Sequence, residues 1–152
     1  MPLLKQGRLA DDPWIAVSGE SPIPDGDPVI VDYDRWIDGK DQLAGRNAPL
    51  GVRLSSDQPP SLIAGDLDRF SLIALEFPKF TDGRAYSHAR LLRERYGFTG
   101  ELRAVGNILR DQLVFLERCG FDSFEVGGPN PEAAYDAAKG EIIHRYQPAG
   151  DR

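Results

Sequence analysis

Short apolar runs alternate with longer amphipathic segments from Pro49 onward, and this alternation limits the possible folds more than any other feature. The runs "LGVRL", "SLIALEF", "ELRAVG" and "SFEV" have the length of strands, and the segments between them have the apolar spacing of helices. Strands that are separated by single helices run parallel and are joined by right-handed crossovers. We therefore predict an α/β fold with a parallel sheet of about four β–α units. Part of a (β/α) barrel and an open doubly wound sheet both fit this pattern.

A short internal repeat supports this division of the chain. The stretches "LLRERYGFTGELRAVG" and "VFLERCGFDSFEVGG" share the order helix, Gly-Phe, polar residue, strand and glycine. Gly97 and Gly120 are expected to take the left-handed conformation that ends a helix, and Phe98 and Phe121 are expected to fold back onto its last turn.

The first 48 residues follow a different pattern. Two short strands around Gln6 and Gly7 predict an N-terminal β-hairpin, and the following "SGESPIPDGDP" has the proline and glycine content of a loop. The run "VIVDYDRW" predicts a strand that passes into a short helix, with Asp32 or Asp34 at its N-cap. A chain of 152 residues is typical of one domain. We treat residues 1–152 as a single α/β domain, with a turn-rich region (1–48) before the regular β–α units (49–146).

Composition narrows the class of partner. The formal net charge of −6 disfavours nucleic acid, because phosphate binding needs a basic face. The single cysteine, Cys119, excludes an internal disulfide and redox dithiols, and its place at a helix C-terminus favours a buried apolar role. No stretch approaches the ~20 apolar residues of a membrane span, and the N-terminus lacks the apolar core of a signal peptide. We expect a cytoplasmic protein that binds neither nucleic acid nor membrane.

Polar residues gather in three segments that follow predicted strands: "PKFTDGRAYSH", "GNILRD" and "VGGPN". Ligand sites of parallel α/β folds lie at the carboxyl ends of the strands, and helix N-termini and arginines there favour a small anion. The predicted ligand-binding residues are Lys79, Arg84, Ser87, Arg103, Asn107 and Arg110, and the candidate catalytic residues are Asp82, Arg84 and Asp111. We predict no metal site.

Several of these residues also have a structural interpretation. Asp82 can serve as a helix N-cap rather than as a general base. Arg84 lies near the same helix start, where a cation opposes the helix dipole, so it needs either a carboxylate partner or an anionic ligand. Arg103 alternates along a strand and can face a helix instead of a ligand. Ser87 and His88 lie about 100° apart on the helix, which excludes a Ser–His pair formed by these two alone.

Four motifs between Phe77 and Val126 occur together: "FPKFTDGRAYS", "LRERYGF", "GELRAVGNILRDQL" and "RCGFDSFEV". In this combination the segment closely resembles a bacterial family of unknown function, DUF934, and the similarity continues more loosely back to the N-terminal hairpin. Members of that family are commonly labelled as oxidoreductases with a link to sulfite reduction, and they are encoded beside assimilatory sulfite reductase genes. Asn107 stands where the resemblance leads us to expect an acid, which argues against a mechanism that needs a carboxylate there.

The resemblance implies a pathway more than a chemistry. The chain has no iron–sulfur ligand set, no dithiol and no dinucleotide fingerprint, so the sequence names no cofactor. We expect an accessory protein of sulfite assimilation that assists sulfite reductase or its siroheme cofactor through an anion-binding rim. The alternative is a small α/β enzyme that acts on a small anionic substrate. A homodimer that completes a barrel is a further arrangement to be tested.

Overall fold

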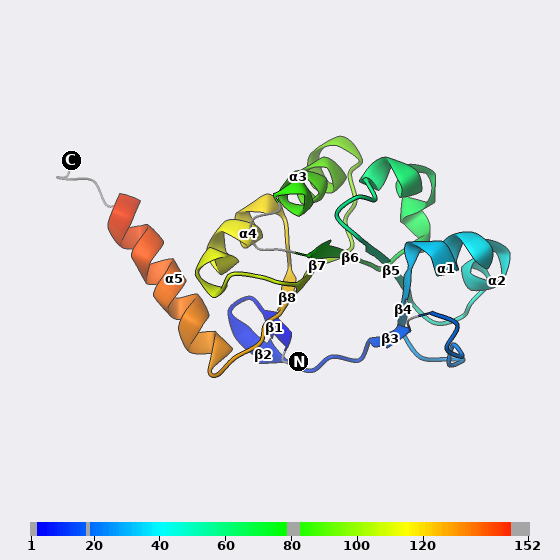
Figure 1. The fold of residues 1–152 in the computed structure, drawn as a ribbon, viewed down its shortest axis with the longest axis horizontal. Helices are drawn as coiled ribbons and strands as arrows, with labels where there is room; N and C mark the ends of the chain where they lie inside the picture. Colours follow the sequence, from blue (N-terminus) through cyan, green and yellow to red (C-terminus); the bar gives the residue numbers. More distant parts are fainter. Residues whose placement is uncertain (1–2, 18, 79–82, 147–152) are drawn as a thin grey trace.

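The computed structural model describes residues 3–17, 19–78 and 83–146, with side chains as far as Gly140. Strands and helices alternate over most of this length (Figure 1). The strands are β1 (Leu3–Lys5), β2 (Arg8–Ala10), β3 (Ile15–Val17), β4 (Val29–Asp32), β5 (Leu50–Leu54), β6 (Leu72–Phe77), β7 (Glu101–Gly106) and β8 (Ser123–Glu125). The α-helices are α1 (Tyr33–Asp38), α2 (Lys40–Ala44), α3 (Arg84–Arg90), α4 (Leu113–Cys119) and α5 (Pro131–Tyr146). The 3-10 segments are η1 (Pro60–Arg69) and η3 (Arg110–Gln112), and the π-helical segment η2 (Leu91–Arg95) continues α3.

All the described strands belong to one eight-stranded sheet, in the order β2-β1-β8-β7-β6-β5-β4-β3. Neighbouring strands from β3 to β8 run parallel, whereas β1 is antiparallel to both β8 and β2. The predicted α/β class is confirmed. The expectation of a parallel sheet of about four units beside an N-terminal hairpin is not confirmed, because β3 and β4 extend the parallel part and the hairpin joins the same sheet through antiparallel pairing of β1 with β8.

The N-terminal hairpin is formed as predicted. Gln6 and Gly7 have φ angles of 53° and 81°, and two consecutive left-handed residues make the tight turn that suits the twist of a two-residue hairpin. The space beside Gly7 is also closed, because a Cβ atom there would lie 2.4 Å from Cε1 of Tyr135 on α5. The turn therefore fixes the hairpin against the last helix as well as reversing the chain.

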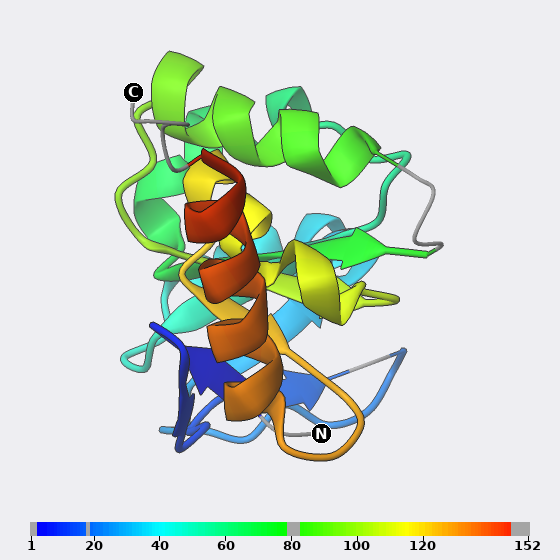
Figure 2. The ribbon, with the colours of Figure 1, turned by 90° about the vertical axis from the view of Figure 1, so that its left-hand side faces the viewer.

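The sheet is curled into a half-barrel. Figure 1 shows it as an arc with α1, α2, α3, α4 and η1 outside the curve, and Figure 2 shows α3 and α4 above the strands from the side. A doubly wound sheet has helices on both faces, so the half-barrel is the arrangement adopted. Chain length requires the curvature. Strands β2 and β3 are the two edges, yet only residues 11–14 join them. A flat eight-stranded sheet would separate its edges by about 34 Å, whereas five residue steps span at most about 17 Å.

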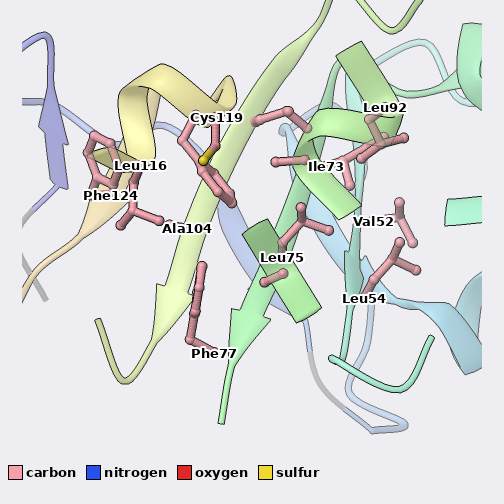
Figure 3. Close-up of a cluster of buried hydrophobic side chains, with 14 of the residues drawn as sticks. Val52, Leu54, Ile73, Leu75, Phe77, Leu92, Ala104, Leu116, Cys119 and Phe124 are labelled. Carbon is pink, nitrogen blue, oxygen red and sulfur yellow. The ribbon is translucent and has the colours of Figure 1, made fainter. Parts of the chain in front are cut away.

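The two faces of the sheet have different cores. The convex face and its helices share a large hydrophobic cluster, part of which is shown in Figure 3 around Leu75, Ala104 and Phe124. The concave face has a smaller cluster of four buried residues: Ile30, Leu72, Ala74 and Val105. Trp14, in the linker of residues 11–14 between β2 and β3, packs against this cluster. Because side chains alternate along a strand, Ile30 lies between Val29 and Val31 of the convex core, and Ala74 lies between its residues Ile73 and Leu75.

The helix ends predicted from the internal repeat are confirmed. Gly120 ends α4 with φ 116°, and Gly97 follows η2 with φ 67°. Phe121 N donates to Leu116 O over 3.2 Å, and Phe98 N donates to Leu92 O over 2.8 Å. Both phenylalanines are buried. At the start of α1, Asp32 accepts a hydrogen bond of 2.8 Å from the backbone N–H of Arg35, as an N-cap does.

Candidate functional site

The loops that follow β6 and β7 lie side by side at the carboxyl edge of the sheet. The backbone N–H of Asn107 donates to Phe77 O over 2.7 Å, and its side-chain Nδ2 donates to Pro78 O over 2.6 Å. Asn107 therefore ties the two loops together through its amide. Lys79 and Asp82 were also predicted for this rim and lie outside the described residues.

Arg110 joins the loop after β7 to the loop after β8. Its Nη2 donates to the carbonyl oxygens of Pro129 and Asn130. Gly128 leaves room for this contact, because a Cβ atom there would lie 2.8 Å from Nη1 of Arg110. Arg110 and Asp111 line a surface hollow of about 490 Å³ beside the start of α5. These two predicted residues are neighbours in the chain and line the same hollow. The guanidinium of Arg110 is already hydrogen-bonded to backbone carbonyls.

Arg84 and Ser87 lie on the first turns of α3, which begins at Arg84 with Gly83 at the N-cap. Arg84 Nη2 donates over 3.0 Å to the hydroxyl of Ser56, a buried residue that follows β5. Ser87 lines a different hollow, of about 550 Å³, on the outer surface of α3 and η2. The predicted rim residues therefore border separate surfaces.

Arg103 lies on the concave side of β7 and is 1% exposed. Its guanidinium meets three carboxylates, at 3.1 Å from Asp12, 3.2 Å from Glu101 and 3.7 Å from Glu125. Its Nε also donates to the hydroxyl of Ser123 over 3.3 Å. Burial of a charge requires paired partners of this kind. The structure thus places Arg103 in an internal ion-pair cluster below the rim, facing away from the helices.

Glu101 is the most strongly bonded acid of this cluster. Burial by itself would raise the pKa of Glu101, but the hydrogen bonds donated by Ser123 and Lys5 and the positive charge of Arg103 outweigh it and hold the pKa below its ordinary value. Ser123 donates to Glu101 over 2.7 Å, and Lys5 donates over 3.2 Å. The cluster therefore connects β1, the linker, β7 and β8.

A cavity of about 380 Å³ opens on the concave face, closer to the carboxyl ends of the strands than this ion-pair cluster. Its charged lining residues come from the carboxyl ends of four parallel strands: Asp32, Arg53, Glu76 and Glu125. Its apolar lining residues come from β3, β4, β6 and β7: Ala16, Val17, Ile30, Ala74 and Val105. In (β/α) barrels, inward side chains at the carboxyl ends of strands form the ligand site.

Sequence reasoning missed this cavity, although a signal was present. Arg53 and Glu76 each interrupt a buried strand at its next-to-last position, and they meet in an ion pair of 2.7 Å. A charged residue at that place in a strand points to the face opposite its apolar neighbours. The repeated position in successive strands was the available signal, but its use requires knowing that the concave face is open.

Two further reactive groups of the described chain, the Cys119 thiol and the Tyr86 phenol, lie in or against the convex core. Cys119 is buried at the end of α4, as predicted, and burial raises the pKa of its thiol. Burial also raises the pKa of Tyr86, whose ring packs edge-on against Phe77 at 5.2 Å. Within the described residues, no group of three histidine, cysteine or acidic side chains is placed to hold a metal ion. No described helix is both long and apolar enough to cross a membrane.

These features define an α/β half-barrel protein whose charged cavity lies where barrel folds bind small molecules. The family model of DUF934, described as a bacterial protein of unknown function, matches residues 51–152, more than half of the chain. The chain therefore belongs to the DUF934 family, as its motifs indicated. Among curated proteins none matches it.

Proposed function

We propose that this protein is an accessory protein of assimilatory sulfite reduction that assists sulfite reductase or its siroheme cofactor by binding. The proposal rests on membership of the DUF934 family, together with the link to sulfite reduction that the resemblance of the sequence motifs implies. The state of the cysteine supports a binding role over thiol chemistry. Cys119 is the single cysteine of the chain and is buried with a raised thiol pKa, so little thiolate forms at neutral pH.

Growth on different sulfur sources tests this proposal. A strain that lacks the gene is expected to grow poorly on sulfate and normally on cysteine, because only the first source requires sulfite reduction. Its sulfite reductase activity should fall at an unchanged amount of reductase polypeptide, and the wild-type gene should restore both. Normal growth on sulfate with full reductase activity would remove the accessory role.

A second measurement separates the two forms of assistance. If the protein contacts the reductase, the two should co-purify from cells at native expression levels. If it serves the cofactor, reductase from the deletion strain should contain less siroheme by absorption, and added siroheme should restore activity in the extract. The anion-binding rim expected from sequence stays a prediction within this proposal.

A small α/β enzyme is the second candidate function. The Arg53–Glu76 ion pair favours it, because the pair lies inside the half-barrel at the carboxyl ends of β5 and β6. Barrel enzymes place their catalytic groups at these positions. In this function Arg53 would orient a substrate and Glu76 would carry a proton. Substitution of Glu76 by Gln should then abolish complementation while the purified variant stays folded.

A further inference from the structure

We propose that the concave cavity binds a small aliphatic ligand through a protonated amine. The proposal concerns the half-barrel alone and does not depend on the pathway in which the protein acts. Among the described residues, three carboxylates and one cation line the cavity. Three features of the cavity indicate this class of ligand: the excess of negative charge, the placement of its carboxylates on different strands, and the apolar part of its lining.

The charge balance on the concave face favours a cation. Arg53 is 2.7 Å from Glu76, so these two lining charges offset each other. Glu125 faces Arg103 at 3.7 Å, but Arg103 also meets two other carboxylates. Considering the cavity and the cluster below it together, five acids meet three cations in the described part of the chain. The acids are Asp12, Asp32, Glu76, Glu101 and Glu125, and the cations are Lys5, Arg53 and Arg103.

The lining carboxylates retain free acceptor atoms. Asp32 uses Oδ1 to cap α1 and Glu76 uses Oε2 for Arg53, so the second oxygen of each carboxylate has no hydrogen-bond donor among the described residues. Glu125 stands at ion-pair distance from Arg103. An ammonium group has three N–H donors and no acceptor, so it matches carboxylates that still need donors.

The spacing of the carboxylates suits an organic cation better than a metal ion. Asp32, Glu76 and Glu125 lie on β4, β6 and β8, and each pair of neighbours in this series is separated by one intervening strand. Backbones two strands apart are about 10 Å from each other in a sheet. The described residues contain no group of three metal ligands. A diamine, whose two ammonium groups are separated by several carbons, can meet two carboxylates that come from different strands.

The apolar part of the lining matches such a carbon chain. Ala16, Val17, Ile30, Ala74 and Val105 contribute it, and all five come from strands. A volume of about 380 Å³ lies within the range of small-molecule sites, which is roughly 300–1,000 Å³. An alkyl amine therefore buries methylene groups against these side chains while its head meets the acids.

Isothermal titration calorimetry at low salt with three unbranched probes tests the proposal. Cadaverine carries two amines and no carboxylate, lysine is the same chain with a carboxylate added, and hexanoate carries a carboxylate and no amine. Cadaverine and lysine should bind saturably, and hexanoate should not. Asp32→Asn and Glu125→Gln should each weaken cadaverine binding by about tenfold, which corresponds to about 1.4 kcal/mol for the loss of a charge-assisted hydrogen bond.

Glu94→Gln is the matched control, because the Glu94 side chain is 71% exposed on η2 and lies outside the cavity lining. It should bind cadaverine as the wild type does. Asp32→Asn is the second variant in case Glu125→Gln fails to fold, since asparagine also serves as an N-cap. Absence of saturable cadaverine binding, equal binding of hexanoate, or full binding by both folded cavity variants would overturn the proposal. The growth phenotype on sulfate is read separately, so the pathway proposal and this one can fail independently.

Discussion

At the scale of single residues, the concave face depends on one buried arginine. Arg103 is shared by Asp12, Glu101 and Glu125, which come from the linker, β7 and β8. Removing one partner from a buried ion pair leaves an uncompensated charge and costs several kcal/mol, whereas the complete pair adds little net stability. The cluster therefore favours the contact of the linker with β7 and β8. Because its acids can be protonated, it also makes the free energy of unfolding depend on pH.

Glu101 is expected to make the protein less stable in acid. Its pKa in the folded state lies below 4.5, its ordinary value, so the folded state binds the proton less readily than the unfolded chain. The contribution is then complete above pH 4.5 and is lost as the pH falls through the folded-state pKa. Measured by urea unfolding, wild type should be more stable than Glu101→Gln at neutral pH, and the difference should shrink as the pH falls below 4.5. A difference that is constant over this range would contradict the assignment, and Glu94→Gln supplies the exposed comparison.

At the scale of elements, the linker of residues 11–14 connects the two edge strands and contacts the concave face of the half-barrel. Trp14 packs against the smaller hydrophobic cluster on that face, and Asp12 forms an ion pair with Arg103. Trp14→Ala removes the apolar cover from this cluster. Because Trp14 is half-buried, we expect a loss of about 2 kcal/mol, less than the 3–5 kcal/mol typical of a fully buried tryptophan.

Thermal unfolding measures this loss. A change of about 2 kcal/mol should lower Tm by about 4–8 °C in a chain of this size. Leu62→Ala is the matched truncation, because Leu62 is 43% exposed on η1, away from the linker. Equal Tm values for the two variants would show that the linker does not cover the inner face.

The same elements show which parts of the structure the sequence could predict. The strand–helix alternation, the hairpin turn at Gln6 and Gly7, and the helix end at Gly120 are local, and they are found where the pattern placed them. The curl of the sheet is not local, because it depends on β1 pairing with β8, more than a hundred residues away. Without that curl, the inward side chain of Glu76 could not be assigned to a cavity. The loop rule pointed to the carboxyl edge of the sheet and selected side chains on the rim, so it did not predict the lining of the concave cavity.

At the scale of the whole molecule, the half-barrel extends beyond the region that the family model matches. The DUF934 match begins at residue 51, whereas β1, β2, β3 and β4 precede it and form half of the strands of the sheet. These strands supply buried core residues such as Leu4, Val31 and Trp36 of the adjoining α1. They also cover both edges of the remaining strands, since β1 pairs with β8 and β4 pairs with β5.

Residues 49–152 alone are therefore not expected to form a stable domain. The fragment would expose two unpaired strand edges and lose part of its core, and native stability is a margin of only about 5–15 kcal/mol. Its circular dichroism should show no cooperative thermal transition, and its ¹H–¹⁵N spectrum should lack dispersion. Co-expression of residues 1–48 as a separate chain should restore both signals, because the break falls in the loop between α2 and β5. A dispersed spectrum and a cooperative transition from residues 49–152 without the partner segment would show that the N-terminal strands are an addition to an independent domain.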